Sequence, residues 1–142
     1  MHILLALTLI VGTTAAALLP AEAQDVKITI DRIVPNGEIS GNVIGLNEAG
    51  RAGSKVVVYV YTDKWYIHPF NSGGEGRSFA SIAKDGKWTI QTVKREHEAS
   101  NIAALVVKRD AEVPAMTEDV KRISNGGIVV RSLKGTPDYG KL

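Results

Sequence analysis

The residues from Lys55 to Tyr61 constrain the fold of this chain more than any other segment. After the lysine, every position is a valine or a tyrosine, and both residue types favour extended backbone. Successive side chains of a strand point to opposite faces, so this segment carries apolar groups on both faces. We therefore expect a central strand that other parts of the chain cover on each side.

The rest of the chain shows shorter strand patterns, separated by turn signals about every ten residues. Pro35-Asn36-Gly37 and Asp85-Gly86 are the clearest of these signals, because they combine a fixed φ or a tolerance of positive φ with small or polar side chains. Gly41 interrupts an otherwise strand-like run, which predicts a bulge or a close backbone approach. Besides the central one, the expected strands are residues 26–31, 39–46, 78–83, 87–93, 102–107 and 128–133.

About seven strands and almost no helix predict an all-β fold, a single β-sandwich of immunoglobulin-like or transthyretin-like arrangement. We expect Asn47 to Ser54 to be a loop, because it holds two glycines and no large apolar residue. Residues Thr117 to Ile123 favour one or two helical turns, with Thr117 as the N-cap. The sandwich domain is expected over residues 24–134, followed by a flexible tail over residues 135–142.

The first 23 residues predict a signal peptide. Ile3 to Leu19 is apolar or small throughout, and Ala21-Glu22-Ala23 places small residues at the two positions that a signal peptidase reads. A retained anchor is the alternative, because the apolar run approaches the length of a membrane span. The polar residues that follow Ala23 favour cleavage there. We therefore expect a secreted or periplasmic protein with no membrane span after cleavage.

The composition excludes several function classes. The chain contains no cysteine, which rules out a disulfide scaffold, thiol catalysis and cysteine-ligated zinc. Its formal net charge is +2, and removal of residues 1–23 would take away one acid, Glu22, and no base. The positive excess is too small and too scattered to indicate nucleic-acid binding.

The segment from Trp65 to Phe70 is the most informative one for function. It carries three aromatic rings and a histidine, directly after the central strand and before a glycine-rich stretch at residues 71–77. Such rings beside polar groups suit a sugar, because its C–H faces stack on the ring while its hydroxyls find donors and acceptors. We expect a ligand-binding surface formed by Trp65, Tyr66, His68, Asn71 and Trp88.

The alternative role for both tryptophans is to close the apolar core, with the indole tips reaching water. Evidence for catalysis is weak: the sequence lacks a G-x-S-x-G turn, and the spacing of His68 and His97 matches no metal motif. Gly73-Gly74-Glu75-Gly76 resembles a phosphate-binding loop only in composition, because no helix and no Lys-Ser or Lys-Thr ending follows it. We expect no catalytic residues, no metal and no cofactor.

Four segments together resemble a small secreted β-sandwich module, immunoglobulin-like or carbohydrate-binding-like, that occurs in exported microbial proteins, often beside glycoside hydrolase domains. The sharpest features are the valine-tyrosine strand leading into Trp-Tyr-Ile-x-Pro and the downstream Asp-Gly-x-Trp. The resemblance spans roughly residues 28–133 and implies a non-catalytic accessory role. The segments are Ile33–Val43, Lys55–Pro69, Asp85–Thr89 and Ile102–Val106.

Two functions follow as expectations. The first is an exported, non-catalytic module that binds carbohydrate or a cell-envelope polysaccharide through the aromatic loop. The alternative is a structural or protein-interaction module of the cell envelope without a small-molecule ligand, which docks an envelope protein through a sheet edge or face.

Overall fold

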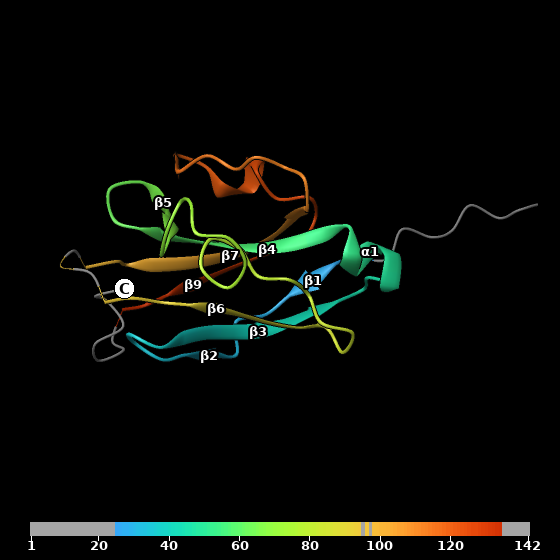
Figure 1. The fold of residues 1–142 in the computed structure, drawn as a ribbon. Coiled ribbons are helices and arrows are strands. Elements are labelled where there is room, and N and C mark those ends of the chain that lie inside the picture. The colour runs from blue at the N-terminus through green and yellow to red at the C-terminus, as the bar shows by residue number, and fades with distance from the viewer. Residues whose placement is uncertain (1–24, 95, 97, 135–142) are drawn as a thin grey trace, which may run out of the picture.

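The computed structural model describes residues 25–94, 96 and 98–134 of the chain. The predicted signal peptide, residues 1–23, and the predicted tail, residues 135–142, lie outside these residues. Two antiparallel sheets are stacked face to face (Figure 1). The fold is therefore an all-β sandwich, as the strand patterns predict.

The first sheet has four strands with β3 (Glu38–Ile44) in the middle. On one side β3 pairs with β1 (Lys27–Ile28) and β2 (Arg32–Ile33), and on the other with β6 (Lys87–Gln91). Exposed and buried residues alternate along β6. This sheet therefore has one apolar face, which points to the other sheet, and one polar face that remains in contact with solvent.

The second sheet has five strands and contains the predicted central strand. Its order is β8 (Met116–Thr117), β5 (Trp65–His68), β4 (Ser54–Tyr61), β7 (Asn101–Lys108) and β9 (Ile128–Ser132). Every residue of β4 from position 56 to 60 is buried, and so is every residue of β7 from 102 to 107. The prediction of a central strand covered on both faces is confirmed.

Burial on both faces requires two apolar cores, one on each side of the second sheet. Even-numbered side chains of β4 lie in the core between the sheets, where they meet Ile39, Trp88 and Ile90. Odd-numbered side chains join a second core on the outer face, which residues 109–127 cover. This segment, called the strap below, is orange in Figure 1 and lies above the second sheet.

Two side chains of β4 fasten the strap to the sheet. The Tyr59 hydroxyl donates a hydrogen bond to the carbonyl of Pro114 at 2.6 Å. The Lys55 ammonium donates one to the carbonyl of Ala111 at 2.8 Å. Burial raises the pKa of Tyr59 to about 12, because the phenolate would lose its hydration inside the protein.

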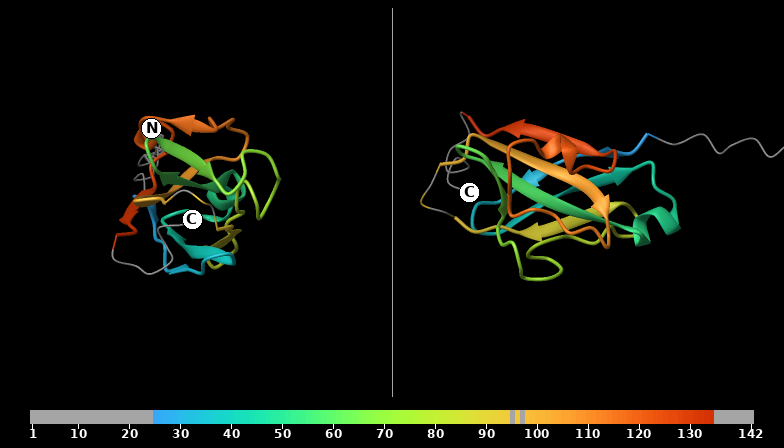
Figure 2. Two further views of the ribbon diagram at one scale, coloured as in Figure 1. Left: turned by 90° about the vertical axis from the view of Figure 1, so that its left-hand side faces the viewer. Right: turned by 90° about the horizontal axis from the view of Figure 1, so that it is seen from above.

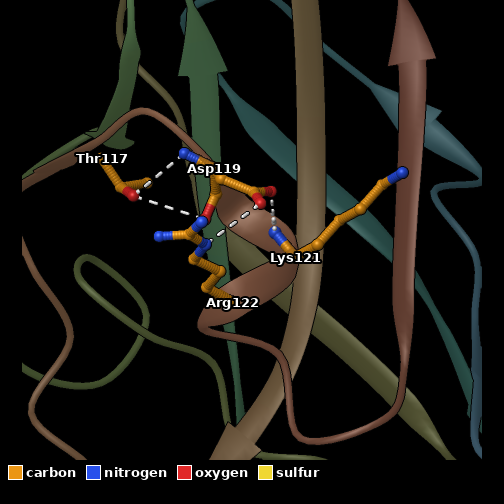
Figure 3. Close-up of polar contacts among 4 residues, drawn as sticks. All are labelled: Thr117, Asp119, Lys121 and Arg122. Atoms are coloured by element: carbon orange, nitrogen blue, oxygen red, sulfur yellow. Dashed lines mark hydrogen bonds and ion pairs between the residues drawn. The ribbon is translucent and has the colours of Figure 1, made fainter.

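The strap contains a short 3-10 helix, η1 (Val120–Arg122), within the range 117–123 where one or two helical turns were predicted. Figure 3 shows how it begins: the Asp119 carboxylate accepts from the backbone N–H of Lys121 at 3.0 Å, and its other oxygen lies 3.6 Å from Arg122 Nε. Asp119 is therefore the N-cap. Thr117 was expected to cap the helix, but its hydroxyl accepts from the N–H of Asp119 at 3.2 Å and only positions the cap.

The backbone between β1 and β2 passes very close to Gly41 of β3. The pairing register with β3 shifts by one residue between β1 and β2, which identifies a β-bulge. A Cβ atom on Gly41 would lie 1.8 Å from the carbonyl oxygen of Thr29. The close approach predicted for Gly41 is confirmed, and the extra residue of the bulge lies in the facing segment, residues 29–31, opposite Gly41.

Both predicted turns are present. Gly37 N–H donates to the carbonyl of Val34 at 2.9 Å, and Asn36 between them has a φ of 54°. At the second turn, Gly86 has a φ of 86° and donates to the carbonyl of Ala83 at 2.9 Å. Asparagine and glycine tolerate this left-handed backbone, which explains their place in each turn.

Two other local predictions were wrong. Asn47 to Ser54 contains a short helix, α1 (Glu48–Ala52), because the Asn47 side chain caps it by accepting from the N–H of Gly50 at 2.8 Å. Residues 78–83 do not form a strand beside β6. They form only isolated bridges, Ala80 with Val56 of the opposite sheet and Phe79 with Glu75.

Candidate functional site

The aromatic segment does not form the single surface that the sequence suggested. It was expected to be a loop, but it forms β5, whose residues 65 to 68 pair with residues 61 to 58 of β4. Neighbouring side chains of a strand point to opposite faces. Trp65 therefore lies on the outer face with Ile67, whereas Tyr66 and His68 lie on the inner face.

The residues expected to bind a ligand also differ in how deeply they are buried. Trp65 is partly buried against the outer core, and its ring centroid lies 5.2 Å from that of Tyr61 in an edge-on arrangement. Trp88 and His68 are each only 2% exposed. His68 forms a hydrogen bond with the Thr92 hydroxyl inside the protein. This burial corrects the expectation that Trp88 and His68 face a ligand, and it assigns Trp88 to the core.

The Tyr66 hydroxyl already has a hydrogen-bond partner in the turn between β4 and β5. It forms a hydrogen bond with the Asp63 carboxylate, which lowers the pKa of Asp63 and raises the pKa of Tyr66. Asn71 lies elsewhere, on the exposed glycine-rich loop. The structure therefore does not bring Trp65, Tyr66 and Asn71 together on one face.

The glycine-rich loop, residues 71–78, is the more informative feature of the structure. It extends away from the sheets in both views of Figure 2. Gly74 and Gly76 have φ angles of 74° and 80°, a conformation that favours glycine. The Gln91 N–H donates to the Gly76 carbonyl at 2.8 Å and ties the loop to β6.

A groove of about 700 Å³, called the polar groove below, lies between this loop and the solvent-facing side of the first sheet. Three separated parts of the chain line it: β2 with the turn that follows and the start of β3, β6, and the glycine-rich loop. Among the described residues that line it, Val34 contributes the only apolar side chain. The charged and polar side chains that line it are Arg32, Glu38, Glu75, Arg77, Thr89 and Gln91.

The two arginines and two glutamates of the polar groove bring no net charge. Arg77 is held over the Phe70 ring, 4.5 Å from its centroid, and Glu75 lies 4.0 Å from Arg109. Within the described part of the chain, Arg32 and Glu38 form no ion pair with each other or with another residue. The groove therefore offers charged donors and acceptors side by side, the combination that a hydroxyl group can use in both of its roles.

The polar groove was not predicted from the sequence. Several of its lining residues lie at outward positions of strands in which polar and apolar residues alternate. From the sequence, such positions are typical of ordinary solvent-exposed residues. They are Arg32, Glu38, Thr89 and Gln91. Gln91 lies opposite Glu38 in the ladder. The alternation marked the polar face, but only the pairing of strands far apart in the sequence shows which polar residues meet.

Comparison with known proteins gives no match to a family model and no significant similarity to a curated protein or a solved structure. Among the residues that the structure describes, no helix has the length and apolar character to cross a membrane. The same residues contain no group of three or more His, Asp or Glu side chains arranged to hold a metal ion. His97 lies outside the described residues.

Proposed function

We propose that this chain is an exported, non-catalytic binding module whose ligand is a hydroxyl-rich polymer such as a cell-envelope polysaccharide. The polymer would lie in the polar groove and not on the aromatic hairpin. The observation that carries the proposal is the convergence of six charged or polar side chains, from three separate segments, on one open groove.

The polar groove is complementary to sugar hydroxyls in its hydrogen-bonding groups. A sugar hydroxyl both donates and accepts, so it is bound best where carboxylates and guanidinium groups lie together. Hydrogen bonds that involve an ionised group are roughly twice as strong as neutral ones. Glu38 and Arg32 can supply such bonds, and Thr89 and Gln91 add neutral partners on a rigid sheet.

The lining of the groove favours a polymer over a small metabolite. The described residues that line it are almost all charged or polar, whereas small-molecule pockets are lined mostly by hydrophobic and aromatic side chains. An extended chain gains affinity by repeating weak contacts along such a surface.

Affinity electrophoresis and isothermal titration calorimetry against neutral and acidic polysaccharides test the proposal. The Thr89→Ala, Gln91→Ala double variant removes two exposed groove side chains without touching the core. We expect it to bind at least about tenfold more weakly than the wild type. The matched control is Trp65→Ala, Tyr66→Ala, which alters the aromatic hairpin and is expected to keep wild-type affinity.

Three results would overturn parts of the proposal. Binding lost only in the hairpin variant would return the site to the aromatic residues. Binding of no polysaccharide by the wild type would remove the glycan function and favour the protein-interaction alternative. Release of reducing sugar by the wild type, abolished by Glu38→Gln, would show that the groove is catalytic.

A further inference from the structure

A second cavity, called the strap pocket below, lies on the opposite side of the glycine-rich loop from the polar groove and has more apolar lining residues. This strap pocket has a volume of about 490 Å³ and lies on the outer face of the second sheet, between the loop and the strap. Its size is within the range of small-molecule sites. Its apolar surface comes from Val57, Ile67, Phe79 and Val113.

The strap pocket also contains a polar group with no partner. Ser78 lines it and is 8% exposed, and its hydroxyl oxygen forms no hydrogen bond with any described residue. The hydroxyl lies beside Gly73, where a Cβ atom would come within 3.2 Å of it. A buried hydroxyl without a partner is costly, so a ligand oxygen that bonded to it would be stabilised.

The positive charges beside the strap pocket indicate the sign of the ligand. The Lys55 ammonium lies 5.2 Å from the centroid of the Phe79 ring and uses one donor on the carbonyl of Ala111. An ammonium has three donors, so two remain available. Arg109 lies 5.8 Å from the same centroid, but it pairs with Glu75 at 4.0 Å and is not a lining residue, so Lys55 is the cation that faces the pocket. Among the described lining residues the acid is Glu112, which is exposed.

We propose that the strap pocket binds a small aromatic carboxylate. Its ring would lie on the apolar surface beside Phe79 and its carboxylate would accept from the Lys55 ammonium. A second oxygen substituent on the ring would bond to the Ser78 hydroxyl after rotation of the serine side chain toward the pocket. The proposal is independent of glycan binding, because the residues that carry it do not line the polar groove.

Amide chemical-shift titrations of the purified protein with benzoate and with 4-hydroxybenzoate test the proposal, with benzyl alcohol as the neutral analogue. We expect saturable shifts confined to residues 55–57, 67, 71–79 and 111–113, and an affinity for benzoate at least about tenfold above that for benzyl alcohol. Lys55→Met should abolish this preference. Lys64→Met, which removes a lysine from the same hairpin outside the pocket, should keep it.

A second variant separates loss of the site from loss of the fold. Ser78→Ala is expected to keep the dispersed spectrum and to weaken 4-hydroxybenzoate several-fold while leaving benzoate unchanged. Equal affinities for benzoate and benzyl alcohol, saturable shifts at other residues, or no saturable shift with either carboxylate would each overturn the proposal.

Discussion

Replacement of Tyr59 by phenylalanine should change how the stability of the protein depends on alkaline pH. Tyr59 is fully buried, and its hydroxyl donates to the carbonyl of Pro114 in the strap. Its pKa is raised from 10.0 to about 12 by burial. The folded protein therefore keeps the phenol proton at pH values where the unfolded chain loses it.

The size of the effect follows from that shift. Because the unfolded state binds fewer protons above pH 10, the free energy of unfolding falls as the pH rises. Two pKa units correspond to about 2.7 kcal/mol, of which about half is lost by about pH 11. Below the unfolded pKa the stabilisation is fully present. There Tyr59→Phe should cost about 1 kcal/mol, the usual contribution of one hydrogen bond.

Urea denaturation followed by tryptophan fluorescence measures both terms. The difference between the wild type and Tyr59→Phe cancels the other tyrosines and the lysines, which titrate in both proteins. We expect the wild type to be more stable at about pH 8 and the order to reverse by about pH 11. A difference that stays constant over this range would refute the assignment of a buried, neutral Tyr59.

Three further predictions concern the fold. Gly41→Ala should destabilise the protein by about 3 kcal/mol in urea denaturation, because its Cβ would collide with the neighbouring backbone. Gly53→Ala is the milder comparison and should cost less, because its Cβ would lie 3.3 Å from the nearest atom. Asn36→Ala should cost about 1 kcal/mol in the same assay, because alanine is strained at a φ of 54°. Trp65→Phe leaves Trp88 as the only tryptophan, and we expect iodide not to quench its fluorescence; quenching like that of free tryptophan would contradict its place in the core.

The layered architecture could be predicted from the sequence, because the pattern of apolar residues in each strand shows which of its faces are buried. The uninterrupted run from Lys55 to Tyr61 is buried on both faces, and the alternating β6 is buried on one. Gly41 was recognised for a similar reason, since a glycine inside a strand pattern has few uses other than a bulge or a close contact. These inferences depend on local chemistry alone.

The functional surfaces were not predictable in the same way, because they depend on which distant segments meet. The aromatic residues looked like one cluster only because they are adjacent in the sequence. Once β5 pairs with β4, alternation sends Trp65 and Tyr66 to opposite faces. Conversely, Glu38 and Gln91 are far apart in the sequence but are paired directly on the neighbouring strands β3 and β6.

Gly76 links the two proposed sites, and its replacement tests whether the loop is their common wall. Its N–H donates to the carbonyl of Phe79 at 2.7 Å, and its own carbonyl accepts from Gln91 at 2.8 Å. One bond fixes a residue of the strap pocket and the other a residue of the polar groove. No atom lies within 4 Å of a Cβ at this position, so Gly76→Ala introduces backbone strain and no collision.

Gly76→Ala should therefore weaken the binding of both polysaccharide and benzoate. Its free energy of unfolding should fall by only about 1 kcal/mol. Gly126→Ala is the matched control, because that glycine also has a positive φ of 119° and open space around its Cβ. It lines neither site and should show a similar loss of stability with unchanged binding of both ligands. If Gly76→Ala weakened one ligand and not the other, the loop would belong to a single site, and the strain would act on that side alone.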